Sequence, residues 1–347
     1  MQTVTHPKTR GSKSKADYAK RQKRNFWIYP AVVLLIYVVW AGYMTFSGSW
    51  DLFSQYWPAS LTMVLGSFVA GATAEGGGAV AYPVFTKVLH LASTDARTFS
   101  LMIQTFGMGM ASLFILTRRI PILPKVILFV SLGGIIGHLL GAFWLVIPGD
   151  YPKLLFTFIT TAFGIVLFIS TYIIKWHPTP QMPVWNNTRK LAFFTVGIFG
   201  GIFAAQVGSG IDALTFMVLT LAFGIDEKIS TPTTVVIMAI NSLVGFLLHG
   251  LVLQDIGQMW NYWLVAVEVV ILGAPFGAYV ISKAPRHMVI NFLLFLIVIE
   301  LITTLILLPI TDTTQRLVTG GAVAVFGFFF WALLRYRHRH LPASEQH

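Results

Sequence analysis

Cysteine is absent from the 347 residues, so neither a disulfide nor a thiolate metal site can form. Charged residues are also scarce, at 11% of the chain, whereas a soluble domain carries about 25%. Hydrophobic residues make up 56%, and the mean hydropathy is +0.74. This balance excludes a soluble globular protein and indicates a multi-pass membrane protein.

Enzyme signatures are missing as well. The chain has no HExxH sequence, no Walker phosphate-binding loop and no nucleophile elbow with triad partners. Its histidines and carboxylates show no spacing typical of metal ligands. We therefore expect no enzyme, no metal and no other cofactor. Because no ATPase motif is present, any transport must draw on an ion or substrate gradient.

The net charge of +11 gathers at the two ends of the chain. Eight lysines and arginines lie within residues 8–24, and three arginines lie within 335–339. Both clusters adjoin apolar segments, as is typical of cytoplasmic ends beside anionic lipid. Membrane lipid, and not nucleic acid, is therefore the expected partner. We expect a multi-pass protein of the inner (plasma) membrane with both termini in the cytoplasm.

Eight apolar segments are long enough to cross a bilayer. They are residues 26–47, 97–117, 124–147, 152–174, 231–250, 260–282, 286–308 and 316–335. Two further apolar regions, 58–92 and 190–223, are interrupted by glycines. Loop charges place both ends of the first region outside and both ends of the second inside. Each region is therefore predicted to be a hairpin of two short helices that does not cross the bilayer.

The two halves of the chain have similar patterns. Gly76 and Gly78 align with Gly208 and Gly210, and a G-x-x-x-G-A motif follows in each half, at 137–142 and 273–278. Small residues at this spacing let membrane helices approach closely. Because loop charges give the halves opposite orientations, the sequence predicts an all-α inverted repeat of about eight transmembrane helices and two broken-helix hairpins.

The expected organisation follows from these segments. It consists of a cytoplasmic basic arm (1–25), a first transmembrane helix with its outer loop (26–57), a first repeat (58–175), a cytoplasmic linker (176–189), a second repeat (190–310), and a last transmembrane helix with a basic tail (311–347).

The two glycine breaks are the candidate substrate site. Glycine can take backbone angles closed to other residues, and helices restarting near Ala79 and Ile211 would present N–H groups and positive dipole ends. Two such ends near the midplane suit a small oxyanion; the alternative is that the glycines only permit close packing. The expected binding residues are Gly76, Gly77, Gly78, Ala79, Tyr82, Gln104, Gln206, Gly208, Ser209, Gly210 and Asn241.

Two carboxylates, Glu75 and Asp212, flank the breaks. A carboxylate at membrane depth is costly and indicates a function. Either group could carry a coupling proton or help to hold a sodium ion. The alternatives are that Asp212 caps backbone N–H groups of the second half-helix and that Glu75 pairs with a neighbouring helix. Lys87, about two turns beyond its break, is expected to extend its ammonium group to the interface; the alternative is that it lines a vestibule that attracts anions.

Three sequence features carry a family resemblance. They are GATAEGGG at 71–78 followed by Tyr82-Pro83, GIFGGIF at 197–203 leading to Gly208–Gly210, and the G-x-x-x-G end of each repeat. Over about residues 58–310 the chain resembles the TauE/SafE family of sulfite and organosulfonate exporters. The second half departs from the family pattern, because Ser209 interrupts its glycines and Thr215 stands where Pro83 aligns.

The resemblance implies a secondary transporter that exports a small sulfur-containing anion, such as sulfite or an organosulfonate, by alternating access. Two alternatives stay open. One is a carrier or channel for another small anion, such as a carboxylate. The other is a membrane accessory protein that transports nothing.

Overall fold

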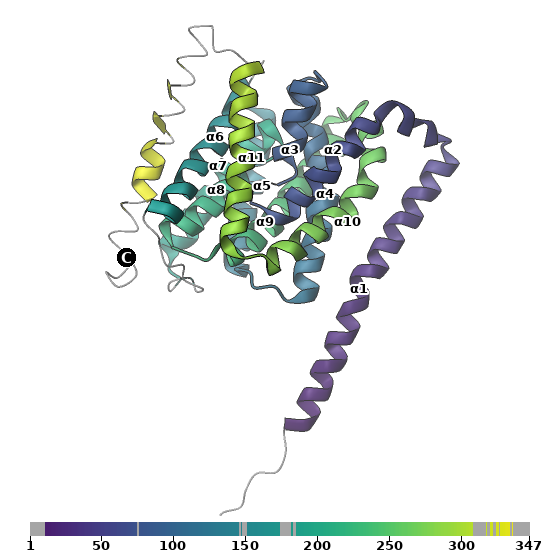
Figure 1. Ribbon diagram of the computed structural model, residues 1–347, viewed down its shortest axis with the longest axis horizontal. Coiled ribbons are helices and arrows are strands. Elements are labelled where there is room, and N and C mark those ends of the chain that lie inside the picture. Colours follow the sequence, from purple (N-terminus) through teal and green to yellow (C-terminus); the bar gives the residue numbers. More distant parts are fainter. Residues whose placement is uncertain are drawn as a thin grey trace, which may run out of the picture.

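Helices are the only regular elements in the part of the chain that the computed structural model describes (Figure 1). The described residues are 11–74, 76–145, 147, 151–173, 182, 185–307, 317, 320–321, 324–325, 327–333 and 335. The predicted all-α class is therefore confirmed.

The helices fall into two similar series. The first half contains α1 (Gly11–Phe46), α2 (Leu52–Ala72), α3 (Gly78–Pro83), α4 (Ser93–Arg118), α5 (Pro124–Phe143) and α6 (Tyr151–Phe168). The second half contains α7 (Asn187–Val207), α8 (Ile211–Met217), α9 (Glu227–Leu247), α10 (Met259–Lys283) and α11 (Arg286–Leu307). Short 3-10 or π segments are η1 (Ser49–Asp51), η2 (Val84–Val88), η3 (Ile169–Ile173), η4 (Val218–Ala222) and η5 (Leu248–Leu253).

Six helices of the described part are long and apolar enough to cross a bilayer. They are Trp27–Phe46, Ser93–Thr117, Pro124–Phe143, Asn187–Val207, Glu227–Leu253 and Met259–Lys283. The predicted spans 152–174 and 286–308 appear as α6 and α11, whereas most of 316–335 lies outside the described residues. The prediction of short helices is wrong for the first arm of each hairpin, because α2 and α7 each have 21 residues.

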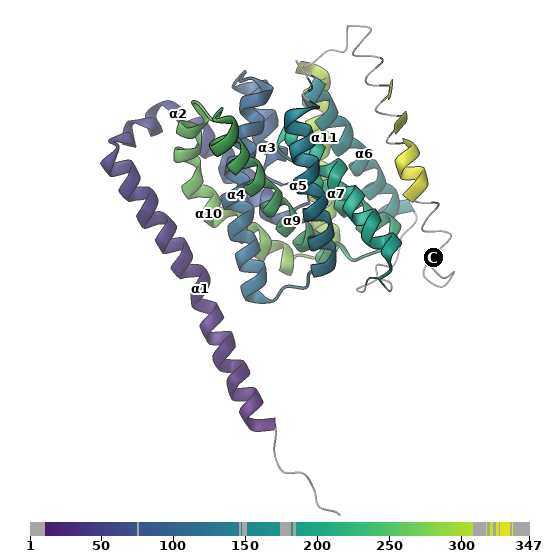
Figure 2. The ribbon, with the colours of Figure 1, turned by 180° about the vertical axis from the view of Figure 1, so that it is seen from behind.

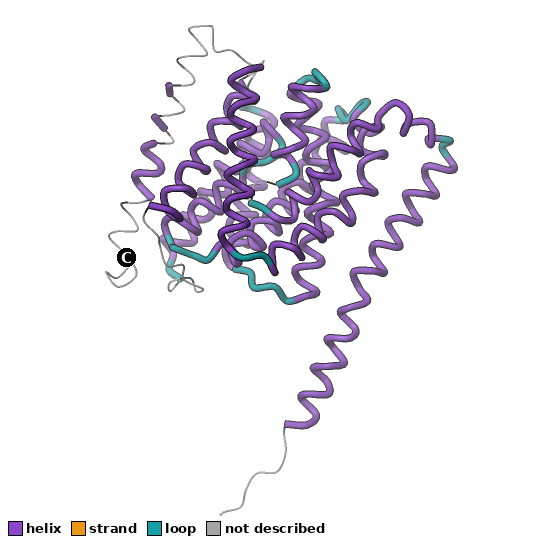
Figure 3. Tube along the Cα trace, in the orientation of Figure 1, coloured by secondary structure: helices purple, strands orange, loops and turns teal. Residues whose placement is uncertain are grey.

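Both hairpins are present in the bundle. In Figure 1 the chain enters α2 and leaves the first hairpin for α4 at the upper edge, and it enters α7 and leaves the second hairpin for α9 at the lower edge. Figure 3 shows the loops between α2 and α3 and between α7 and α8 in the interior. The predicted pair of oppositely entering hairpins is therefore confirmed, while the assignment of the edges to outside and inside stays a prediction.

The helix contacts repeat when the halves are exchanged. The first helix of one repeat, α2, packs along α10 of the other, and the corresponding helix α7 packs along α5 (Figures 1 and 2). The counterparts α4 and α9 pack against each other, as do α6 and α11. A two-fold relation between the repeats produces this pattern, as the inverted repeat requires.

Glycines explain how these helix pairs approach so closely. A methyl group on Gly137 of α5 would overlap the backbone of Ile198 on α7. On Gly277 of α10, it would overlap the carbonyl of Phe68 on α2. Each G-x-x-x-G motif therefore fastens its own repeat to the first helix of the other repeat, which is the role expected of small residues in membrane helices.

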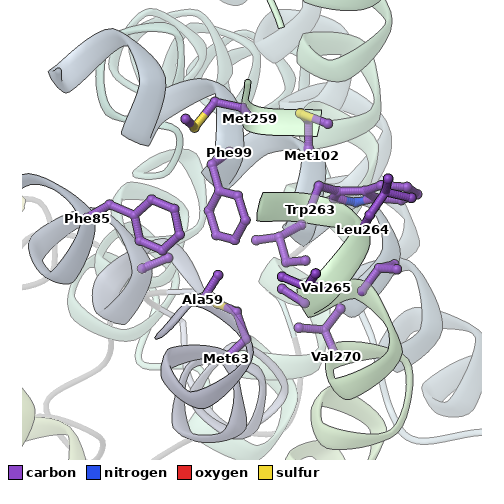
Figure 4. Close-up of a cluster of buried hydrophobic side chains, with 14 of the residues drawn as sticks. Ala59, Met63, Phe85, Phe99, Met102, Met259, Trp263, Leu264, Val265 and Val270 are labelled. Atoms are coloured by element: carbon purple, nitrogen blue, oxygen red, sulfur yellow. The ribbon is translucent and has the colours of Figure 1, made fainter. Parts of the chain in front are cut away.

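An aromatic and methionine cluster packs the first hairpin against its neighbours (Figure 4). The rings of Phe85 in η2 and Phe99 in α4 stack with centroids 4.1 Å apart, and both side chains are fully buried. On the outside of the bundle, α1 contacts α10 through Tyr37 and Trp40, which donate hydrogen bonds to backbone carbonyls of that helix. The cluster fixes the half-helix that begins at the first break.

Candidate substrate site at the two helix breaks

The two breaks contact each other in the middle of the bundle. A Cβ added to Gly78, the first residue of α3, would lie 3.1 Å from Ser209 Oγ and 3.2 Å from Gln104 Nε2. Ser209 belongs to the second break, and Gln104 lies on α4. Residues that the sequence predicts from both halves therefore meet at one place. Ser209 and Gln104 are each only 1% exposed, so both are closed off from either face in this conformation.

Three of the predicted glycines have backbone angles that other residues rarely adopt. Gly76, Gly208 and Gly210 have φ values of +70°, +82° and +121°. Gly77 does not share this property, because its φ is −67°. The helices restart at Gly78 and Ile211, in agreement with the expected restarts near Ala79 and Ile211.

The side chain of Gln104 joins the first repeat to the second break. Its Nε2 donates hydrogen bonds to the carbonyl of Gly208 at 2.7 Å and to that of Ser100 at 3.0 Å. Both amide hydrogens are thereby used, which fixes the orientation of the amide. Gln104 Oε1 consequently faces the first break, where a methyl group on Gly76 would overlap it.

Asp212 lies in the first turn of α8 and is fully buried. Its Oδ1 accepts hydrogen bonds from the N–H groups of Gly210 and Ala213, both at 3.0 Å. The capping role considered for this carboxylate is therefore present. Its other oxygen, Oδ2, would lie 2.9 Å from a Cβ on Gly76 and so faces the first break.

Three buried polar atoms at this contact have no hydrogen-bond partner among the described residues: Ser209 Oγ, Gln104 Oε1 and Asp212 Oδ2. Leaving a buried polar group unpaired costs about 1–3 kcal/mol. Three such atoms at one place make the contact between the breaks the candidate binding site.

Two other predicted residues have contacts of their own. Both side-chain polar atoms of Gln206 are engaged elsewhere: Nε2 donates to the carbonyl of Gly141 at 2.9 Å, and Oε1 accepts from the N–H of Ile147 at 3.0 Å. The ring of Tyr82 packs against that of Phe156 on α6. Gln206 therefore anchors the end of α5, and Tyr82 contributes to the core.

The remaining predicted residues are Asn241, Ala79 and Glu75. Asn241 on α9 lies beside Gly134 of α5, where a Cβ would be 3.2 Å from Asn241 Oδ1 and would crowd Ile211 at the start of α8. Its amide is buried without a hydrogen-bond partner in the described part of the chain. Ala79 falls within α3, whereas Glu75 lies outside the described residues.

Arg97 is a cation near the second break that is absent from the residues predicted for the site. Its Nη1 donates to the carbonyl of Ala205 at 3.3 Å, and its Nη2 lies 3.9 Å from Asp255 Oδ2. Its side chain is 11% exposed. Arg97, Ser100 and Gln104 have the i, i+3, i+7 spacing of one helix face, which is the sequence signal that could have placed Arg97 near the break.

The expectation that Lys87 reaches the interface is wrong. Its Nζ lies 2.7 Å from Glu300 Oε1 on α11, and the two side chains are only 4% and 8% exposed. Thr304 accepts a hydrogen bond from Lys87 at 2.6 Å, and Thr157 of α6 donates one to Glu300 at 2.9 Å. Lys87 therefore ties the end of the first hairpin to α6 and α11.

Comparison with known protein families supplies the identification. The family model described as sulfite exporter TauE/SafE matches residues 59–304. The chain belongs to this family. The suspected resemblance is thereby confirmed, and the protein is a multi-pass membrane transporter and not an enzyme. Searches of curated proteins and of solved structures find no match. In this TauE/SafE protein, the matched range contains both breaks and every predicted site residue.

Proposed function

We propose that this protein is a secondary transporter that exports a small sulfur-containing anion, such as sulfite or an organosulfonate, by alternating access around the two helix breaks. The observation that carries the proposal is the contact of Gly78 with Ser209 and Gln104, which brings the breaks of the two halves together. The half-helices begin at Gly78 and Ile211, so both N-terminal ends lie at this contact. Substrate sites between such half-helices are typical of inverted-repeat transporters.

The two half-helix ends offer different chemistry to an anion. At the half-helix that begins at Gly78, the N-cap residue is Gly77, which has no side chain to accept from the backbone N–H groups. At the other half-helix, by contrast, the Asp212 carboxylate already accepts from two backbone N–H groups. The hydroxyl of Ser209 lies beside the end at Gly78. Backbone donors of the first break together with Ser209 therefore form the expected anion site.

Alternating access requires a movement that pivots about the contacts by which the halves are joined. The α2–α10 and α5–α7 contacts each link a helix of one repeat to a helix of the other. In the described conformation the contact between the breaks is buried. The substrate must therefore enter after a movement of the two halves relative to each other, first on one side and then on the other.

A cavity at the end of the bundle predicted to be cytoplasmic supports an anionic substrate. It has a volume of about 410 Å³ and reaches Gly71, near the end of α2 and shortly before the first break. Four cationic residues and one acidic residue line it: Arg118, Arg119, Lys228, Lys283 and Glu227. An excess of positive charge in a recess raises the local concentration of anions, which suits the loading side of an exporter.

Counterflow into vesicles containing the purified protein tests this proposal. Labelled sulfite and a short sulfonate should exchange, whereas acetate and chloride should compete poorly. A hydrogen bond to a charged group contributes about 1.5–3 kcal/mol, so Ser209→Ala should weaken affinity about ten-fold to a hundred-fold. Ser54→Ala, on the exposed start of α2, is the matched control and should behave like wild type.

The outcomes separate the alternatives. Preference for acetate or chloride would identify a carrier of another anion, and flux without saturation or counterflow would indicate a channel. Absence of flux for every anion would favour an accessory protein. An unchanged affinity of Ser209→Ala would remove this hydroxyl from the site.

A further inference from the structure

Two buried oxygen atoms, one from each repeat, lie close to the same point of the first break, the position of a Cβ on Gly76. Asp212 Oδ2 would lie 2.9 Å from a Cβ on Gly76, and Gln104 Oε1 would overlap that same methyl group. Neither oxygen has a hydrogen-bond partner among the described residues. Asp212 is fully buried, and Gln104 is 1% exposed. The break therefore holds two converging acceptors where a stable site needs a donor or a positive charge.

Rotating the amide of Gln104 does not resolve this conflict. In the present orientation its Nε2 donates to the carbonyls of Gly208 and Ser100. The opposite orientation would place the amide oxygen against those two carbonyls and leave both without a donor. The hydrogen-bond network thus assigns Oε1 to the side of Asp212.

No neighbouring cation neutralises Asp212 among the described residues. The buried or half-buried titratable groups on the helices around the breaks include Arg97 on α4, His138 on α5 and Tyr82 on α3. Arg97 pairs with Asp255, and the ring of His138 lies against Gly245 of α9. The charged groups of α7 and α9, namely Arg189, Lys190, Glu227 and Lys228, lie in the first turns of those helices. Glu75 lies outside the described residues.

A proton resolves the conflict with a single atom. An O–H on Asp212 Oδ2 would remove the buried charge and donate a hydrogen bond to Gln104 Oε1. A bound metal cation fits less well, because hard cations take about six or more oxygen ligands. Among the described residues, four side-chain oxygens without a hydrogen-bond partner lie at the two breaks, those of Asp212, Gln104, Ser209 and Ser100.

We propose that Asp212 is the proton carrier of this transporter, an inference that rests on the proposed function. With the breaks in contact, the Oδ2–H group of Asp212 donates to Gln104 Oε1. When the halves separate, water reaches the carboxyl group and the O–H bond breaks. The proton then leaves into the water on that side, and a carboxylate stays behind. That carboxylate repels an anion at Ser209, so one proton is taken up with each anion that binds. An outward anion gradient then drives export, and the protons leave with the anion.

Proton uptake during binding tests this proposal on the purified full-length protein. A short alkylsulfonate is the probe, because it stays ionised across the pH range. The affinity of wild type for the sulfonate should fall about ten-fold for each unit of rising pH above the range in which Asp212 stays protonated. In that upper range, and in weakly buffered solution, wild type should take up one proton for each sulfonate that binds. Asp212→Asn should take up none and should bind with an affinity that does not change with pH. Asp226→Asn, at the half-buried N-cap of α9, is the control and should match wild type.

Several results would overturn the proton carrier. The proposal is wrong if Asp212→Asn still takes up protons or if sulfonate binding depends on sodium. It is also wrong if wild type binds sulfonate without taking up protons, although that result would leave the proposed function intact. If Asp212→Asn does not fold, Gln104→Met takes its place. Without the Oε1 acceptor the affinity should fall at a lower pH than in wild type, and an unshifted profile overturns the proposal. Failure of wild type to bind sulfonate, sulfite, acetate or chloride overturns the proposed function and this inference together.

Discussion

The ion pair between Lys87 and Glu300 is a strong test of how the first hairpin is held in the bundle. Both side chains are nearly fully buried, and their charged atoms are 2.7 Å apart. Lys87→Met leaves a buried carboxylate without its cation, and Glu300→Leu leaves a buried ammonium without its anion. Removing one partner of a buried pair costs about 3–5 kcal/mol. We expect each single variant to lose that much of its free energy of unfolding.

The double variant should recover most of this loss. When both charges are removed, Thr157 and Thr304 can keep the hydrogen bond that joins their hydroxyls at 2.7 Å. Replacing a buried pair by apolar side chains is often neutral, or stabilising by about 1–4 kcal/mol. The double variant should therefore be more stable than either single variant, which gives a large positive coupling in the double-mutant cycle.

Titration of the purified protein with a denaturing detergent, followed by tryptophan fluorescence, measures these free energies. Lys228→Met removes an exposed lysine and should stay within about 0.5 kcal/mol of wild type. Single variants that lose less than about 1 kcal/mol, or a double variant that loses the sum of both, would refute the reasoning. The pair would then be solvated in the native protein, and the hairpin end would be held by packing alone.

Two other predictions concern topology and packing. Because the chain has no cysteine, single cysteines report location directly: Ser54→Cys and Thr94→Cys should both react with an impermeant reagent from outside, and Lys228→Cys only from inside. Reaction of the first two from opposite sides would remove the hairpin model. Gly137→Ala should sharply lower the midpoint of detergent unfolding because its methyl group meets the α7 backbone, whereas Gly109→Ala meets nothing within 4 Å and should not. Equal midpoints would mean that the α5–α7 contact is looser than described.

The repeat and its breaks could be predicted because their signals are local. Glycines interrupt an apolar segment at Gly76 and again at Gly208, and helix breaks at membrane depth need such residues. The number of lysines and arginines in each loop then predicts which loops are cytoplasmic, and so the orientation of each segment in the membrane. The start of the first hairpin helix is harder to predict. The sequence suggests a start at residue 58, whereas α2 begins at Leu52 in the structure. Pro58 lies inside α2, and a proline at that point is usually a sign that a helix is not continuous.

The orientation of individual side chains could not be predicted in the same way. Gln206 is next to the second break in sequence, yet its amide is used by Gly141 and Ile147. Gln104 is far from that break in sequence, and it donates to Gly208 directly. Lys87 finds its acidic partner 213 residues away. The hydrogen-bond partner of each side chain depends on which helix faces pack together. Where a helix is apolar on all sides, its hydropathy pattern does not show which face packs against a neighbour.

The structure also assigns unequal chemistry to two breaks that look alike in sequence. The second break supplies the acid and the hydroxyl, Asp212 and Ser209, whereas the first supplies a half-helix that begins at Gly78 with a glycine as its N-cap residue. Gln104, on a helix of the first repeat, binds the second break through its nitrogen and faces Asp212 through its oxygen. Substrate and proton would therefore share one contact between the halves. Any movement that separates the halves opens both sites at once, so a single rocking motion is sufficient to couple them.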